Sequence, residues 1–251
     1  MSARASQQAV VMQQDDNLIS WVIVRRALAF LISAGVISWL VFWLQQPNTL
    51  PISKIRALGV FEKVDENMLR SVVAQTVDGG YFSVNVDQVQ SAVEQLPWVL
   101  QASVSRVWPD TISINIVEQK ALAVWELGGL VNQQGTLFKP DATSYPLGLP
   151  TLDGPIGMQR NMTEFYQLAK SIVEPLGVSV IRIQMDSRRA YQVRLSNGIQ
   201  LLLGREHTQN RLERFARVYK KVLSQKATDI ASIDMRYSNG LAVGWKDKTR
   251  E

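Results

Sequence analysis

The sequence predicts an α+β protein: a single N-terminal transmembrane helix, a first external domain of order β-α-α-β-β, and a mixed β-domain with flanking helices. Three observations predict it. An uncharged run near the N-terminus is long enough to cross a bilayer, two amphipathic helical patterns then lie between strand patterns, and short strand patterns dominate the rest. We expect a cytoplasmic tail at 1–26, the transmembrane helix at 27–44, the first domain at 50–118 and the β-domain at 119–251.

The transmembrane prediction rests on 18 consecutive uncharged residues, 27–44. As a helix they would rise about 27 Å, close to the roughly 30 Å of bilayer hydrocarbon. Trp39 and Trp43 lie towards the far end, where aromatic rings favour the membrane interface. A cleaved signal peptide would have a shorter apolar core and a small-residue cleavage site, and a buried core helix would have a polar face. An uncleaved anchor fits best.

The flanking charges predict the orientation of this anchor. Arg25 and Arg26 precede it, and no charge follows it until Lys54. The positive-inside rule therefore places the N-terminus in the cytoplasm and about 200 residues outside it. We expect a single-pass type II membrane protein.

Composition excludes several kinds of site. The 251 residues include no cysteine and one histidine, His207. Disulfides, thiolate metal sites, cysteine nucleophiles and two-histidine metal motifs within one chain are therefore excluded, and we expect no metal or cofactor. The sequence also has no GxSxG, Ser-x-x-Lys or phosphate-loop motif, which disfavours a membrane-anchored cell-wall hydrolase.

The two external segments differ in charge. Residues 45–118 carry 5 basic and 8 acidic side chains, whereas residues 119–251 carry 19 basic and 12 acidic ones. An external basic domain meets little nucleic acid, so we expect none to be bound. Anionic lipid, cell-wall polymer or an acidic protein partner are better candidates.

In the first external domain a strand is expected at 52–60. Asp65 can cap a first helix, and Asp87, with Gln90 three residues on, forms a capping-box-like start to a second. Pro97 marks the end of that helix.

A hairpin is expected to complete this domain. Its strands are 99–107 and 111–117, joined by a turn at Trp108-Pro109-Asp110. Trp98 is expected to pack between the preceding helix and the first of these strands. The face expected to be buried carries Ile112, Ile114 and Ile116.

In the β-domain, residues 150–155 read as a loop. Helices are expected to begin at a cap on Asn161 and at Thr208, and hairpins to turn at Asn197-Gly198 and Asn239-Gly240. The expected strands are 121–125, 130–132, 135–138, 178–185, 191–195, 199–203, 230–237 and 241–246. The apolar stripe expected on the Thr208 helix is Leu212, Phe215, Val218, Val222 and Leu223.

The β-α-α-β-β order with this hairpin resembles a POTRA domain, a module of bacterial inner membranes and the periplasm. Longer elements resemble the FtsQ family of cell-division proteins over residues 27 to about 246. They are Leu96-Pro97-Trp98, Val104, Arg106, Trp108-Pro109-Asp110, Val117-Glu118, Ala123-Val124-Trp125, Asn197-Gly198, Leu203-Gly204-Arg205, Arg211-Leu212, Arg214-Phe215, the run 233–237 and Gly244-Trp245.

The resemblance implies a non-enzymatic, bitopic inner-membrane protein of the division septum that recruits and links divisome components. It implies binding of FtsB, and through it FtsL, by strand addition at the edge of the β-domain, with FtsK, FtsW and FtsI as further partners. Val104 and Arg106 would take part in recruitment by FtsK. The residues implied at the FtsB edge are Arg188, Tyr237, Ser238, Asn239, Gly240 and Trp245.

Some alternatives stay open. The guanidinium of Arg188 suits a carboxylate, but plain surface charge explains it as well. Residues 182–221 hold 10 basic and 3 acidic side chains, which is either a solvated face or a lipid or cell-wall contact. The alternative function is a POTRA-bearing component of a secretion or outer-membrane assembly system.

The charge flank makes the topology testable. Alkaline phosphatase fused after Glu251 should be active, because the positive-inside rule places that end outside the cytoplasm. Replacing Arg25 and Arg26 with glutamate should reduce this activity. An inactive phosphatase fusion, together with fluorescence from a cytoplasm-type reporter fused at the same position, would contradict the orientation.

Overall fold

The computed structural model describes residues 3–44, 46, 50–59 and 62–246. The chain forms two compact units. Unit 1 comprises residues 1–60, 66–93 and 102–116, and unit 2 comprises residues 61–65, 94–101 and 117–251.

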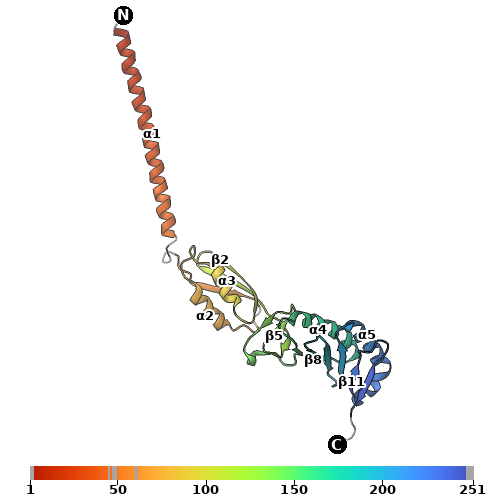
Figure 1. Ribbon diagram of the computed structural model, residues 1–251. Coiled ribbons are helices and arrows are strands. Elements are labelled where there is room, and N and C mark those ends of the chain that lie inside the picture. Colours follow the sequence, from red (N-terminus) through yellow and green to blue (C-terminus); the bar gives the residue numbers. More distant parts are fainter. Residues whose placement is uncertain (1–2, 45, 47–49, 60–61, 247–251) are drawn as a thin grey trace. The chain divides into compact units, whose positions relative to one another are not determined.

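The N-terminal part is one long helix, α1, at Ala3–Leu44 (Figure 1). Within it the 22 residues Ile23–Leu44 are long and apolar enough to cross a membrane, and none of them is buried inside the protein. The predicted span 27–44 therefore lies within a longer continuous helix. Exposed apolar side chains along the whole segment favour a lipid environment over water.

The predicted β-α-α-β-β order is present and lies in unit 1, except that residues 94, 99–101 and 117–118 of these elements belong to unit 2. Its elements are β1 at Lys54–Leu58, α2 at Glu66–Thr76, α3 at Val86–Glu94, β2 at Val99–Val107 and β3 at Thr111–Glu118. The sheet order is β1-β3-β2, with β1 parallel to β3. The expected first strand was too long: it ends at Leu58, and its predicted last residue, Val60, lies outside the described residues.

The core of unit 1 comes from one face of each element, as the sequence patterns predict. Leu69 and Val73 of α2 and Val89 and Val93 of α3 are fully buried. The central strand β3 contributes its predicted isoleucine row, Ile112, Ile114 and Ile116. Each such side chain contributes about 1.5–3 kcal/mol by leaving water.

Two predicted helix caps were wrong. Asn85, not Asp87, caps α3: its Oδ1 accepts hydrogen bonds from the backbone N–H groups of Asp87 and Gln88 at 3.1 and 3.2 Å. Asp87 instead lies in the first turn, where a carboxylate favours the helix N-terminus. Helix α4 begins before Asn161, after the positive-φ Gly157, so the turn and not a side-chain cap sets its start.

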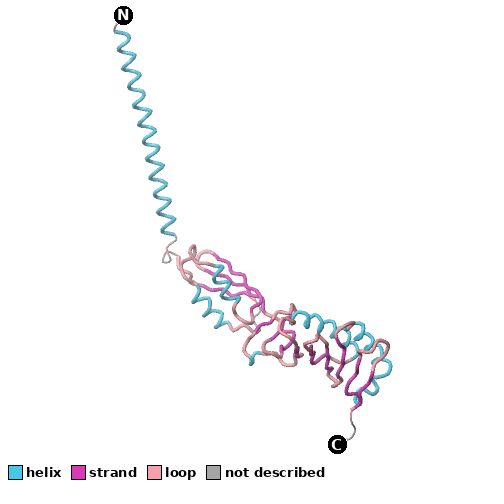
Figure 2. Tube along the Cα trace, in the orientation of Figure 1, coloured by secondary structure: helices cyan, strands magenta, loops and turns pink. Residues whose placement is uncertain are grey.

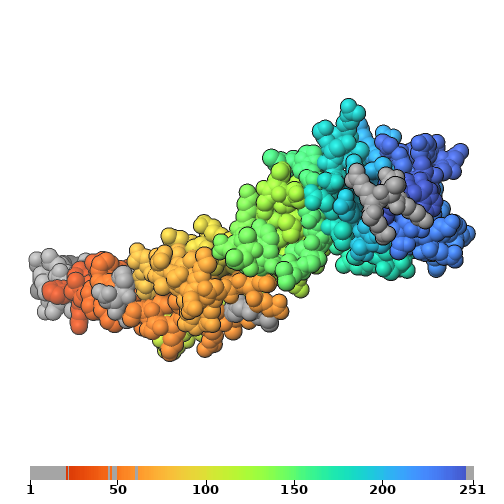
Figure 3. Space-filling model, turned by 90° about the horizontal axis from the view of Figure 1, so that it is seen from below, coloured from red at the N-terminus to blue at the C-terminus, as the bar shows by residue number. Residues whose placement is uncertain are grey.

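Unit 2 is a nine-stranded sheet of order β12-β11-β10-β9-β8-β7-β4-β5-β6. The strands are β4 Ala121–Trp125, β5 Leu130–Asn132, β6 Leu137–Phe138, β7 Thr151–Asp153, β8 Val180–Met185, β9 Tyr191–Leu195, β10 Gln200–Gly204, β11 Ile230–Asp234 and β12 Ala242–Trp245. The C-terminal residues, blue in Figure 3, form one end of this unit, and its first strands, green, form the other.

Two helices cover one face of this sheet. They are α4 at Gln159–Val173 and α5 at Thr208–Val218, and Figures 1 and 2 show both on the same side of the strands. A π-helical turn, Tyr219–Leu223, and the 3-10 segment Ser224–Asp229 continue from α5. Two further 3-10 segments are Ala142–Ser144 and Glu174–Leu176.

Strand β7 corrects the expectation of a loop at 150–155. Residues Thr151–Asp153 lie between β4 and β8 and pair in parallel with both, and Leu152 is fully buried. Three residues are too short to show an alternating pattern, and the proline at each end reads as a loop signal. The neighbouring strands therefore decide this conformation.

The apolar stripe predicted for α5 and the turn that follows it is also partly wrong. Leu212 and Phe215 are fully buried, but Val222 is 63% exposed and Tyr219 is buried instead. The π-helical turn adds one residue to the helical repeat, which rotates the buried face.

Trp98 belongs to unit 2, so its expected position between α3 and β2 was wrong. It packs with Leu130 and Phe138, and its ring stands edge-on to that of Phe138 with centroids 5.2 Å apart. Its Nε1–H donates to Ser144 Oγ at 3.1 Å. The residues after Pro97 therefore anchor the start of β2 in unit 2.

Removing this indole should destabilise unit 2. Trp98 is 7% exposed, so Trp98→Ala should cost about 3–5 kcal/mol and lower the Tm of the purified chain by roughly 10 °C. Trp108→Ala is the matched control because Trp108 is 74% exposed. Equal Tm values for the two variants would contradict this position for Trp98.

Candidate partner-binding edge

Strand β12 ends the nine-stranded sheet. It pairs antiparallel with β11, with Asp234 opposite Ala242 and Ile230 opposite Trp245. Within the part of the chain that the structure describes, no strand lies on its other side. The outward backbone N–H and C=O groups of β12 are therefore open to another strand. The sequence predicts a sheet edge over residues 230–246. The structure limits the open edge to β12, because β11 pairs with β10 on its other side.

The side chains of β12 alternate between the two sheet faces. Val243 packs against the main core, and Trp245, on the same face, is 52% exposed. Gly244 faces the other way, where an added Cβ would lie 2.5 Å from Ser232 Oγ. The glycine thus lets β12 lie close to β11.

The β11–β12 loop, residues 235–241, is longer than the tight hairpin predicted at Asn239-Gly240. Of its predicted site residues, Tyr237 is 58% exposed. The structure brings four predicted site residues together along one shallow hollow: Tyr237, Ser238, Asn239 and Gly240.

Two arginines of α5 hold this loop, and we call Arg211 and Arg214 the arginine clamp. Arg214 donates to the carbonyl oxygens of Ser238, Met235 and Tyr237 at 2.6, 2.9 and 2.8 Å. Arg211 donates to the carbonyls of Leu203 and Arg236. The guanidinium fork supplies several donors in one plane, which suits successive loop carbonyls.

The clamp was missed as a structural element, because the sequence showed only a basic helix face. The available signal was the position of both arginines, three residues apart, on a helix that follows β10 directly. Such a spacing places them on one side of the helix.

An ion pair between Arg236 and Asp234 orders the start of the loop. Arg236 donates to both carboxylate oxygens of Asp234, with a shortest distance of 2.7 Å, and its backbone N–H donates to Oδ1. The hydrogen bonds from this guanidinium hold the pKa of Asp234 below its ordinary value. Asp234 therefore stays ionised at neutral pH and keeps the last residue of β11 in place.

Arg188 lies in the β8–β9 turn with its side chain exposed. Oδ1 of Asp186 accepts hydrogen bonds from the backbone N–H groups of Arg188 and Ala190, both at 2.8 Å, and Arg189 has a φ of 63°. The turn is thus ordered by the Asp186 carboxylate, and the Arg188 guanidinium makes no hydrogen bond or ion pair with the described residues.

The sheet register shows at which end of the sheet each of the predicted FtsB-edge residues lies. Tyr191 pairs with Met185 and Gly204, and Asp234 pairs with Ala242. The Arg188 turn and the β11–β12 loop therefore leave the same end of the sheet, about 15 Å apart at roughly 4.8 Å per strand. Trp245 lies at the opposite end of β12, about 10 Å away along the strand, and lines a different hollow.

Val104 and Arg106 lie on β2, at an edge of the unit 1 sheet. Arg106 Nη2 donates to the carbonyl of Val84 at 2.7 Å, and Val104 is half-buried. His207 immediately precedes α5 with a φ of 53°. Among the described residues no group of three acidic or histidine side chains is placed to hold a metal ion.

Comparison with known proteins places this chain in a family. Residues 50–119 match the POTRA domain of FtsQ type, and residues 123–236 match the C-terminal domain of cell division protein FtsQ/DivIB. Cell division protein FtsQ of Coxiella burnetii is 33% identical over 221 residues, 88% of this chain and 89% of the relative. This chain belongs to the FtsQ family.

Other relatives agree over similar lengths. The FtsQ proteins of Aliivibrio fischeri and Xanthomonas campestris pv. campestris are 33% and 32% identical, covering 83% and 90% of this chain and 83% and 80% of their own lengths. The FtsQ family is a non-enzymatic component of the divisome, which confirms the predicted class of function. The C-terminal domain match ends at Arg236, so Tyr237 and β12 lie beyond it.

The arginine clamp can be tested on the free protein. Arg214→Lys keeps the charge but loses the fork, so it should destabilise the β11–β12 loop locally by about 1.5–3 kcal/mol. Amide hydrogen exchange in residues 235–241 should accelerate by at least tenfold. Arg217→Lys is the control, because Arg217 is exposed on the same helix and makes no described side-chain hydrogen bond. Unchanged exchange in Arg214→Lys would refute the clamp.

Proposed function

We propose that this chain is a bitopic inner-membrane division protein that binds FtsB, and through it FtsL, by strand addition at β12. Membership of the FtsQ family supplies the divisome context. The observation that carries the proposal is the open outer edge of β12, which leaves backbone donors and acceptors for an added strand.

The side chains around β12 supply selectivity in this proposal. Backbone pairing gives affinity to any extended segment, so specificity needs anchors beside it. Tyr237 is the exposed aromatic at one end and Trp245 at the other. Arg188, at the same sheet end as Tyr237, offers a planar guanidinium to an acidic side chain of FtsB. Ser238, Asn239 and Gly240 line the backbone path between the loop and β12.

The remaining assignments belong to the same proposal. Residues 1–26 form the cytoplasmic tail, 27–44 the anchor, 50–118 the POTRA domain and 119–251 the β-domain at the septum. FtsK recruitment uses the β2 surface at Val104, with Arg106 holding that surface through the Val84 carbonyl. FtsW and FtsI are further partners.

The alternative function, a component of a secretion or outer-membrane assembly system, would use the POTRA domain alone. It leaves the match of residues 123–236 to the FtsQ/DivIB C-terminal domain without a role. Family membership therefore favours division.

Binding by anchor variants tests the proposal. Tyr237→Ala should weaken binding of a soluble FtsB–FtsL fragment by about 1–3 kcal/mol, or roughly 5- to 150-fold, because exposed aromatics dominate interface energetics. Arg188→Glu should also weaken binding, more strongly at low salt, since its charge is exposed. The measurement is a titration of the detergent-purified chain, with circular dichroism as the folding control.

Matched variants give the contrast. Phe82→Ala removes an exposed aromatic from unit 1, and Arg194→Glu reverses an exposed charge on β9, away from the β12 edge. Both should bind at full strength. A folded Tyr237→Ala, Arg188→Glu double variant that binds like these controls would place the partner site elsewhere.

A further inference from the structure

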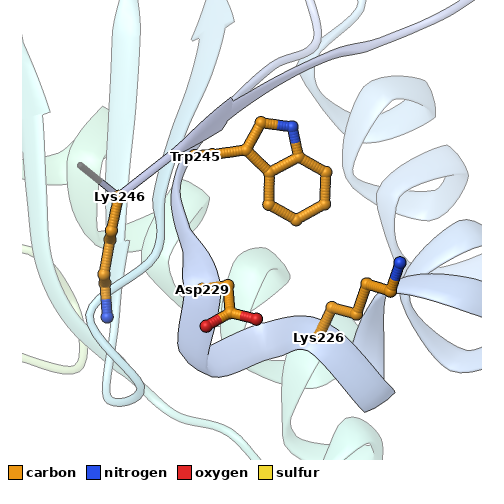
Figure 4. A pocket seen from close by; sticks show the side chains of 4 residues that line it. All are labelled: Lys226, Asp229, Trp245 and Lys246. Carbon is orange, nitrogen blue, oxygen red and sulfur yellow. The ribbon is translucent and has the colours of Figure 1, made fainter. Parts of the chain in front are cut away.

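The C-terminal end of β12 borders a hollow in which only Trp245 has a role in the proposed binding of FtsB. It is lined by Lys226, Asp229, Trp245 and Lys246, and we call it the Trp245 hollow. Figure 4 shows the Trp245 ring, the Lys226 side chain and the Asp229 carboxylate around one open space, whereas the Lys246 side chain lies on the other side of the backbone that carries Asp229. The backbone of the hollow is fixed, because the N–H of Lys246 donates to the carbonyl of Asp229 at 2.8 Å.

The ammonium groups at the hollow are not neutralised within the described residues. Neither Lys226 nor Lys246 lies within 4.0 Å of a carboxylate there, Asp229 included. The adjoining stretch 217–226 carries four basic side chains and no acidic one. Among the residues that the structure describes, the end of the sheet edge near Trp245 therefore has a net positive charge, with one carboxylate against two lysines in the hollow itself.

Strand geometry places the next chain beside this hollow. A strand added to β12 runs about 4.8 Å from it, and its side chains alternate between the two faces. Trp245 shares the helix-covered face with Val243. A partner residue level with Trp245 and on that face therefore has its side chain against the Trp245 ring, which borders the hollow, whichever way the partner strand runs.

We propose that the Trp245 hollow is a subsite for an acidic side chain of the segment that adds to β12. This inference rests on the proposed strand addition and names the chemistry at its second end. The apolar stem of an aspartate or glutamate packs on the indole, and its carboxylate lies beside the ammonium group of Lys226, while Lys246 adds positive charge from the other side of the Asp229 backbone. With Arg188 at the opposite end of the sheet, the edge then selects a segment that carries acidic residues on both sides of its paired stretch.

The choice of an acid over an aromatic or basic side chain follows from the lining. Two cations repel a lysine or arginine, and their exposed ammonium groups would be desolvated by a purely apolar ring. A carboxylate pairs with the Lys226 ammonium group and keeps its remaining hydrogen bonds with water. The binding contribution of such exposed pairs is modest and depends on salt.

Charge reversal at the hollow tests this subsite. The full chain in detergent is titrated with the soluble FtsB–FtsL fragment, comparing Lys226→Glu/Lys246→Glu with the matched pair Lys220→Glu/Lys221→Glu. The control pair makes the same charge change on the neighbouring helical turn, outside the hollow. The hollow pair should bind about tenfold more weakly at low salt, and the loss should shrink at high salt. The control pair should stay within about twofold of wild type.

A charge swap identifies the contact directly. Each acidic residue of the FtsB–FtsL fragment is changed to lysine in turn, and one of these variants should recover binding to Lys226→Glu while binding the wild-type chain more weakly. Equal losses in the hollow and control pairs, or no recovery by any swap, would overturn the subsite. If Tyr237→Ala weakens binding but the hollow pair does not, strand addition stands and the subsite fails. If the wild-type chain does not bind the fragment, both the strand addition and the subsite are contradicted.

Discussion

The hydrogen bonds from Arg211 and Arg214 to the β11–β12 loop are the interaction on which the proposed binding edge depends. A sheet edge needs a defined register to select a partner, and β12 is only four residues long. Its entry loop would have few partners of its own, but the arginine clamp satisfies the carbonyls of residues 235–238 from a helix that is itself buried through Leu212 and Phe215. The core of unit 2 thereby orders an exposed surface.

In the proposed function, this arrangement lets one short strand act as a specific surface. The paired backbone is generic, and the distinguishing groups lie at its two ends, Arg188 and Tyr237 at one and the Trp245 hollow at the other. Because the groups stand on different elements, a partner must span the whole strand to reach them all. Selection then depends on the length and charge pattern of the partner segment as much as on any single contact.

Much of the fold could be predicted from the sequence because its signals are local. The uncharged run, the isoleucine alternation of β3 and the strand patterns of β4, β5 and β9 all correspond to elements of the structure. The predictions were wrong where residues distant in the sequence determine the local conformation or burial. Strand β7 exists because β4 and β8 flank it, and Trp98 is buried by Phe138, 40 positions along the chain.

The candidate site was less predictable for the same reason. The sequence indicated an edge at the final hairpin, and the structure ends the sheet there, but side-chain roles on α5 depended on tertiary contacts. Arg211 and Arg214 looked like Arg217, yet only the clamp pair faces the loop carbonyls. The π-helical turn after α5 exposed Val222 against expectation, because an inserted residue is invisible to a 3.6-residue pattern.

The central claim is that a partner strand lies alongside β12, and disulfide mapping tests it most directly. The chain has no cysteine, so Ala242→Cys, Val243→Cys and Trp245→Cys, which leave Gly244 in place, can each be paired with a cysteine scan along the FtsB segment. Strand addition places opposite Cα atoms about 4.5–5.5 Å apart, within the roughly 4.4–6.8 Å that a disulfide spans. It predicts crosslinks that shift by one partner residue for each step along β12. Crosslinks without such a register, or none at β12, would contradict it.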